Sequence, residues 1–141
     1  MALAKIAALG VICLISGVGS ASAECETEFY NHNGSQMRAE RCGPELSIYY
    51  EQPRSGIVRQ GVVPGTLFFN GYISNNGDTE LIAGTARVFK RGCQPAEFPV
   101  EGYYVGNGGV GGEPIHLEGQ APSRKSGCAT SGWRLEILDF N

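Results

Sequence analysis

Short segments rich in aromatic and β-branched residues, separated by Gly, Pro, Asn and Ser, most restrict how this chain can fold. From residue 24 onward, no segment places apolar residues at i, i+3, i+4 and i+7 over three turns, as an amphipathic helix does. The spacing instead favours about six to eight short antiparallel strands. We therefore expect an all-β fold, either a small antiparallel β-barrel or a sandwich.

The expected strands are short segments rich in aromatic and β-branched residues, and turn formers separate them. These strands are residues 37–41, 46–50, 66–73, 80–89, 97–104, 115–119 and 133–138. Residues 46–50 and 133–138 alternate, whereas residues 66–73 could be covered on both faces. Residues 74–78 read Ser-Asn-Asn-Gly-Asp, which predicts a hairpin turn because Asn-Gly favours positive φ. Pro99 lacks an N–H, so its strand is expected at a sheet edge or with a bulge. Residues 24–34 are polar with turn formers, and the glycine-rich residues 106–112 are expected to form a loop.

Residues 1–23 have the composition of a secretory signal peptide. Lys5 supplies the positive charge, residues 6–15 are apolar, and Ala21-Ser22-Ala23 is a small-x-small cleavage site. The same pattern also fits an uncleaved anchor, but the apolar run is short for a spanning helix of about 20 residues. We expect residues 1–23 to be removed, leaving a single β domain of residues 24–141 in the periplasm or secreted.

Four cysteines remain once Cys13 leaves with the leader: Cys25, Cys42, Cys93 and Cys128. An even number in an oxidising compartment indicates two disulfides. Three pairings are possible, and we favour Cys25–Cys42 with Cys93–Cys128 because each closes a modest loop beside expected strand ends. Each bridge would stabilise the fold by about 3 kcal/mol. No C-x2-C or H-x3-H pair is present, so no zinc site is expected.

Charge limits the expected partners. Residues 24–141 carry ten Lys and Arg against fourteen Asp and Glu, a net charge of −4 with neutral histidines. This balance disfavours nucleic acid or an anionic membrane surface as a partner, and no later segment is apolar enough to span a membrane. A cationic partner is compatible with it.

Groups for catalysis are scarce. His32 falls in a turn, and His116 alternates with apolar residues, so it is expected on the outer face of a strand. No G-x-S-x-G elbow is present, and bridged cysteines leave no thiol. We predict no catalytic residue, no metal site and no cofactor. A small hydrolase remains a third hypothesis that would need a convergent carboxylate pair. The available glutamates are Glu51, Glu80, Glu97, Glu101, Glu113 and Glu118.

One segment has the composition of a binding loop. Tyr49, Tyr50, Glu51, Arg54 and Ser55 place two aromatics, a carboxylate and a guanidinium around one turn. Tyr and Arg are enriched where proteins contact partners. The competing interpretation is that one tyrosine packs in the core, the other covers an edge, and Arg54 pairs with Glu51.

About half of the chain resembles a group of small, largely uncharacterised exported proteins of Gram-negative bacteria. The shared motifs are N-H-N-G-S at 31–35, I-x-Y-x-x-P-R-x-G at 48–56, G-V-x-P-G-T-L-x-F-x-G at 61–71, G-T-A-R-V-F at 84–89 and F-x-V-x-G at 98–102. The layout is similar to that of periplasmic lysozyme inhibitors, which are small disulfide-bearing β-barrels that insert a loop into a muramidase cleft. The S-G-x-x-Y and T-K-G elements of the C-type inhibitors do not occur here, so no inhibitory residue is carried over by motif.

These observations yield two binding hypotheses. The first is a periplasmic protein that inhibits or controls lysozyme or an endogenous peptidoglycan hydrolase by inserting the loop Tyr49–Gly56 into the enzyme cleft. The second is a non-catalytic structural or glycan-binding module of the cell envelope, with peptidoglycan as a possible ligand.

Overall fold

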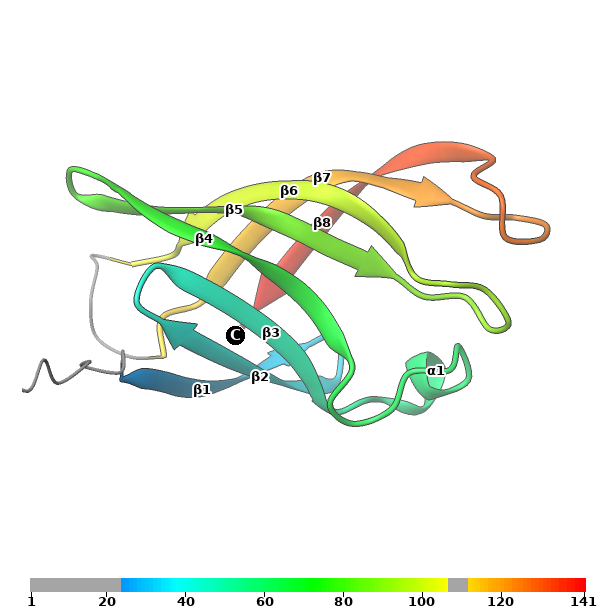
Figure 1. The fold of residues 1–141 in the computed structure, drawn as a ribbon, viewed down its shortest axis with the longest axis horizontal. Helices are drawn as coiled ribbons and strands as arrows, with labels where there is room; N and C mark the ends of the chain where they lie inside the picture. The colour runs from blue at the N-terminus through cyan, green and yellow to red at the C-terminus, as the bar shows by residue number, and fades with distance from the viewer. Residues whose placement is uncertain (1–23, 107–111) are drawn as a thin grey trace, which may run out of the picture.

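The computed structural model describes residues 24–106 and 112–141. The expected signal peptide and most of the glycine-rich loop lie outside the described residues. Within them the chain forms eight antiparallel strands and one short helix, so the expected all-β fold is confirmed (Figure 1). The strands are β1 Cys25–His32, β2 Ser35–Cys42, β3 Glu45–Gln52, β4 Leu67–Asn76, β5 Thr79–Val88, β6 Ala96–Tyr104, β7 Ile115–Ser123 and β8 Gly132–Phe140, and the helix is α1 Ser55–Val58.

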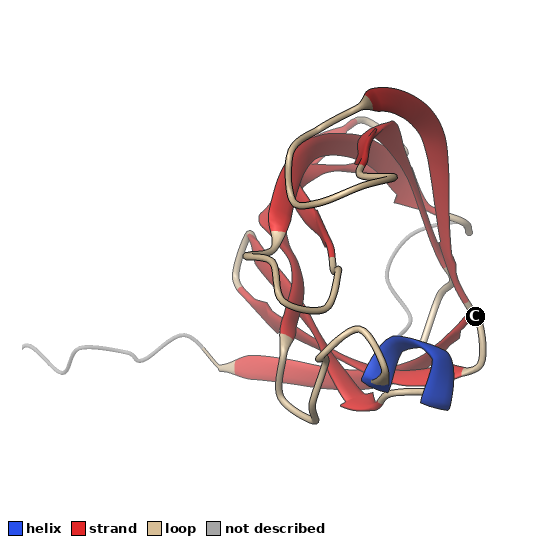
Figure 2. Cartoon of the chain, turned by 90° about the vertical axis from the view of Figure 1, so that its right-hand side faces the viewer, coloured by secondary structure: helices blue, strands red, loops and turns tan. Residues whose placement is uncertain are grey.

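All strands belong to one sheet in which each strand pairs with its neighbours in sequence order. The sheet curls round its apolar face (Figure 2), and its edge strands, β1 and β8, meet at one point. There Asn31 and Asn141 exchange two backbone hydrogen bonds of 2.6 and 3.0 Å. We call the gap between the two edge strands the seam. No ladder joins β1 to β8 along the seam, so the sheet is not closed into a barrel.

The inner face of the curl holds one apolar core. Alternation along most of each strand directs every second side chain inward, as a half-buried strand requires, although neighbouring residues are both buried at Phe68–Phe69 of β4 and at Ala121–Pro122 of β7. The largest fully buried side chains are Phe69, Phe98, Phe140, Met37, Leu46, Ile48, Ile82, Ile115, Leu117 and Leu138. Burying an apolar side chain of this size contributes about 2 kcal/mol, so these inward rows supply most of the driving force.

Two disulfides join the pairs that the spacing favoured. Cys25–Cys42 links the start of β1 to the end of β2, with a Cα–Cα distance of 4.3 Å. Cys93–Cys128 links the β5–β6 and β7–β8 connections, at 5.4 Å. Disulfides are typical of proteins outside the reducing cytosol, which agrees with an extracytosolic location. In the described ranges, no helix has the length and apolarity to cross a membrane.

Two expectations from the sequence need correction. Residues 25–32 form a strand although their composition suggested turns, because Tyr30 and His32 point inward while polar residues and Phe29 point outward. The strand containing Pro99 is not at an edge, since β6 lies between β5 and β7. Pro99 pairs with Thr85 of β5, and the ladder from β6 to β7 ends before it, at Glu101. The missing N–H therefore falls where β7 no longer requires a donor.

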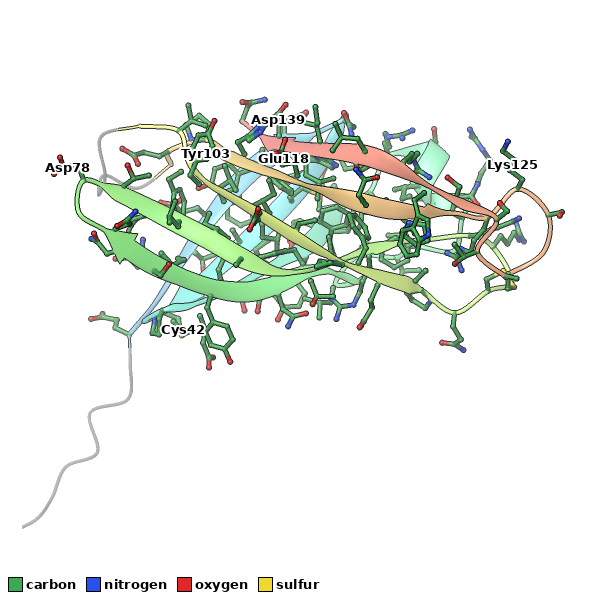
Figure 3. The ribbon with its side chains drawn as sticks, turned by 90° about the horizontal axis from the view of Figure 1, so that it is seen from above. Cys42, Asp78, Tyr103, Glu118, Lys125 and Asp139 are labelled. Atoms are coloured by element: carbon green, nitrogen blue, oxygen red, sulfur yellow. A yellow bond between two sulfur atoms is a disulfide. The ribbon has the colours of Figure 1, made fainter. Side chains whose placement is uncertain are left out.

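The antiparallel order places alternate connections at opposite ends of the molecule. The β3–β4, β5–β6 and β7–β8 connections lie at the end that carries α1, on the right in Figure 1. The β2–β3 and β4–β5 turns lie at the other end. Figure 3 shows the same separation, with Lys125 at one end and Asp78 at the other.

Candidate binding pocket

A pocket of about 210 Å³ opens beside the seam, at the end that carries α1. The pocket forms because the inward-facing side chains of β8 change from apolar to charged along the strand. Phe140 and Leu138 are buried, Glu136 is half-buried, and Arg134 is exposed. The lining residues are His32, Asn33, Ser35, Tyr50, Arg54, Ile57, Phe68, Arg87, Val88, Phe89, Phe98, Arg134, Glu136 and Leu138.

His32 is a buried polar wall of the pocket. Its Nδ1 lies 2.8 Å from the carbonyl oxygen of Asp139, and its Nε2 lies 3.2 Å from Nδ2 of Asn33. A carbonyl only accepts and an amide nitrogen only donates, so the ring carries its proton on Nδ1 and is neutral. Burial lowers the pKa of His32, which agrees with this state. The ring also stacks on Phe140 at 4.7 Å between centroids.

Tyr50 supplies an aromatic wall with a polar tip. Its ring makes edge contacts with Phe68 and Phe89, at 5.5 and 5.9 Å between centroids. Burial raises the pKa of Tyr50 to about 12, with Arg54 acting in the opposite direction. The phenol is therefore a neutral hydroxyl at physiological pH, able to donate or accept a hydrogen bond.

Charged groups lie at the rim. Arg134 donates from Nε to Oε2 of Glu136 at 3.0 Å. Arg54 is exposed, and its backbone N–H donates to Oγ of Ser35 at 3.0 Å, which fixes the start of the helical turn against β2. Within the described ranges the Arg54 guanidinium has no ion-pair partner. Arg87 is already engaged, because its guanidinium bonds Glu97 at 2.9 Å and Asn70 at 2.8 Å.

The arrangement combines an apolar floor with a rim of net positive charge. The floor is formed by Phe68, Phe98 and Leu138 and has no ionisable group. At the rim, the guanidiniums of Arg54 and Arg134 lie with the single carboxylate of Glu136. Such a site is suited to a small ligand with an apolar body and one negative charge. An engineered apolar cavity of about 150 Å³ binds benzene, so this pocket has room for a ring-sized group.

The predicted binding residues take separate positions. Tyr50 is buried in the pocket wall, and Tyr49 lies under the Arg38 guanidinium, 4.8 Å from the ring centroid. Glu51 pairs with Arg38 at 3.0 Å rather than with Arg54. Arg54 reaches the pocket rim, and Ser55 begins α1. The interpretation in which one tyrosine enters the core is therefore confirmed, with Tyr50 as the buried one, but its expected Glu51–Arg54 pair is wrong.

Three residues of the pocket were missed. The sequence around His32 predicts a turn, and the alternation of apolar and charged residues along 133–138 predicts a half-buried strand with Arg134 and Glu136 on its solvent side. They point inward instead, since Arg134 lies opposite Ala121 and Glu136 opposite Gly119 on the inner face. The small partners Ala121 and Gly119 were the available signal, because they leave space for long charged side chains.

A second cluster lies in a hollow of about 580 Å³ on the outer face of β5, β6 and β7. Nδ1 of His116 is 2.6 Å from Oδ1 of Asp139, which confirms the outward position of His116. Glu101 lies opposite Glu118 on the neighbouring strand, and Figure 3 shows Glu118 and Asp139 on this face. The Glu118 side chain is 55% exposed. The two carboxylates are neighbours on an open outer face, so their position gives the hydrolase hypothesis no specific support.

Family models, curated proteins and solved structures were compared with the chain, and none matches. The described residues also contain no group of three or more His, Cys, Asp or Glu arranged to hold a metal ion.

Proposed function

We propose that this is a non-catalytic binding protein whose pocket beside the seam takes a small organic monoanion with an apolar body. The observation that carries the proposal is the position of Arg54 and Arg134 at the rim of an aromatic and aliphatic floor. The apolar part of the ligand would lie against Phe68 and Leu138, and its carboxylate would accept hydrogen bonds from the guanidiniums. The Tyr50 hydroxyl offers a further donor.

Benzoate and hexanoate are suitable probes, with benzyl alcohol and hexanol as their neutral counterparts. We expect the acids to raise the melting temperature in proportion to the logarithm of their concentration, and the alcohols to do so much less, because only the acids use the guanidiniums. Arg54→Gln and Arg134→Gln should each weaken acid binding about tenfold, the loss of one charge-assisted hydrogen bond. Calorimetric titration measures both effects.

Arg38→Gln is the matched control, because it removes one guanidinium from β2 at a position outside the pocket lining. It should leave the affinity for benzoate unchanged. Equal affinity for acids and alcohols, or equal losses in the control and the rim variants, would contradict the proposal.

A second candidate function is the control of a peptidoglycan hydrolase such as lysozyme. It is supported by the end of the molecule opposite α1, where the described connections hold Asp78 and Glu113 and no Lys or Arg. This end complements a cationic enzyme electrostatically. The contact surface would then be that acidic end, since Tyr50 and Glu51 are already engaged within the molecule.

A muramidase turbidity assay tests the second candidate. Wild-type protein at micromolar excess should slow lysis, and Asp78→Asn should weaken the effect while Glu97→Gln, at the other end, should not. Lysis at an unchanged rate, across lysozyme types and peptidoglycan hydrolases, would exclude hydrolase control. Binding to isolated peptidoglycan without inhibition would favour an envelope glycan-binding module.

A further inference from the structure

The end that carries α1 has a strongly one-sided charge. Its three long connections, residues 53–66, 89–95 and 124–131, contain six Lys or Arg and no Asp or Glu. The six are Arg54, Arg59, Lys90, Arg91, Arg124 and Lys125. We call these three connections the basic pole. Residues 24–141 are net acidic, yet six of their ten Lys and Arg lie at this end.

The nearest carboxylates on the strands do not neutralise the pole. Glu97 is engaged by Arg87 of β5 at 2.9 Å, and Glu136 by Arg134 of β8 at 3.0 Å. Four cations of the pole, Arg54, Arg59, Arg91 and Lys125, are exposed, and their side chains have no ion pair among the described residues. Their charges therefore face solvent.

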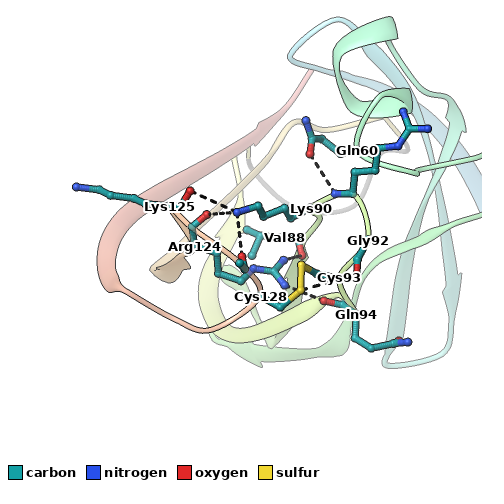
Figure 4. The surroundings of a disulfide bond; sticks show 11 residues. Gln60, Val88, Lys90, Gly92, Cys93, Gln94, Arg124, Lys125 and Cys128 are labelled. Carbon is teal, nitrogen blue, oxygen red and sulfur yellow. Dashed lines mark hydrogen bonds between the residues drawn. A yellow bond between two sulfur atoms is a disulfide. The ribbon is translucent and has the colours of Figure 1, made fainter.

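The remaining two cations bind the connections to one another. Lys90 donates to the carbonyl oxygens of Arg124 and Gly127 at 2.8 and 2.9 Å. Arg124 donates to the carbonyl oxygens of Gln94 and Val88 at 2.8 and 3.0 Å. Figure 4 shows these bonds beside the Cys93–Cys128 disulfide, with the Lys125 side chain directed away from them.

A further hydrogen bond joins the β5–β6 connection to the β3–β4 connection, because the backbone N–H of Arg91 donates to Oε1 of Gln60 at 3.2 Å. The three connections thus form one braced surface. The exposed cations therefore project from connections that are bonded to one another rather than from independent loops.

The same end of the molecule also carries exposed apolar side chains. Val58 and Val63, on the β3–β4 connection, are 47% and 60% exposed. Trp133, at the start of β8, is 63% exposed and lies opposite Pro122, two residues before Arg124. Cations interspersed with exposed apolar groups and a tryptophan are the composition of surfaces that lie at a membrane interface.

We propose that the basic pole docks on a membrane surface rich in anionic lipid headgroups. The cations approach the headgroup phosphates, and Val58, Val63 and Trp133 enter the interfacial layer. The exposed apolar residues favour a membrane over a soluble polyanion, which would need the cations alone. The inference does not depend on the pocket beside the seam, and its test uses residues outside the pocket.

Vesicle binding tests this proposal. The purified protein should cosediment with phosphatidylcholine vesicles containing about one third phosphatidylglycerol, and not with pure phosphatidylcholine, and binding should fall as salt rises. Trp133 is the only tryptophan of the chain, so its fluorescence reports on the pole directly. Its emission should shift to the blue on binding, and lipids with brominated chains should quench it.

The decisive variant is Arg91→Gln with Lys125→Gln. It should weaken vesicle partitioning about 25-fold, roughly fivefold for each cation removed. Arg38→Gln with Arg41→Gln changes the net charge equally, on β2, and should leave partitioning within about twofold of wild type. Circular dichroism confirms that each variant is folded. The single changes Lys125→Gln and Arg38→Gln provide the same comparison if the control pair unfolds.

A second pair of variants measures how much the exposed apolar side chains of the basic pole contribute to vesicle binding. Val63→Ser should reduce partitioning, whereas Tyr72→Ser, at an equally exposed position on β4 beside Glu45, should not. Equal losses in the Arg91/Lys125 and Arg38/Arg41 pairs, or binding to neutral vesicles at the same strength, would overturn the proposal. Binding to heparin or nucleic acid without a Trp133 blue shift on vesicles would overturn it in favour of a soluble polyanion.

Discussion

At the scale of single residues, the pocket depends on polar groups that are held neutral by burial. His32 and Tyr50 are both nearly inaccessible to water, and burial moves their pKa values in opposite directions, downward for the imidazole and upward for the phenol. Both directions favour the uncharged form. The charged groups of the site are therefore confined to its rim, where water stabilises them.

The lowered pKa of His32 makes the stability depend on pH. The unfolded chain binds a proton at His32 more readily than the folded chain does. The free energy of unfolding is therefore highest above the ordinary histidine pKa of about 6.5 and falls as the pH drops below that value. The loss reaches at most about 1.4 kcal/mol per pH unit for one group. Arg54, Glu136 and the carbonyl of Asp139 also act on this ring, with smaller effects than burial.

Urea unfolding at several pH values between neutral and mildly acidic conditions measures this dependence. His32→Gln should reduce the loss. A His32→Gln variant with the wild-type pH dependence would show that other groups cause the loss.

At the scale of elements, the curl of the sheet depends on a pair of glycines. Gly71 of β4 lies opposite Gly84 of β5, and the ring of the fully buried Phe69 lies over both. A Cβ on Gly84 would meet the Gly71 Cα at 2.6 Å and the Phe69 ring at 2.8 Å. Glycine is therefore required here for close approach, which lets the sheet bend around the aromatic ring.

Gly84→Ala should lower the free energy of unfolding by about 1 to 3 kcal/mol, because the methyl group overpacks the core. Gly132→Ala is the matched control on β8, since a Cβ there meets nothing within 4 Å. It should be neutral or slightly stabilising, because alanine restricts the unfolded chain. Chemical denaturation of both variants measures the difference, and similar values for the two would contradict this account of the curl.

At the scale of the whole molecule, the antiparallel order sorts the charges. Consecutive connections alternate between the two ends, so the basic connections after β3, β5 and β7 gather at one end and Asp78 and Glu113 at the other. A net charge of −4 for residues 24–141 conceals this separation. The expectation that an anionic surface is an improbable partner rested on that sum, and the separation of charge is the reason to propose one.

The sequence by itself indicated the strands after residue 34, because strand periodicity and turn residues are local signals. Among three possible cysteine pairings it favoured the one that the structure contains. It also placed His116 on an outer face. Only the tertiary structure decided that Tyr50 is the buried tyrosine, that Glu51 pairs with Arg38, and that Arg134 and Glu136 point into a pocket. These outcomes depend on the register between strands and on which connections share an end, and both arise from pairing between segments far apart in the chain.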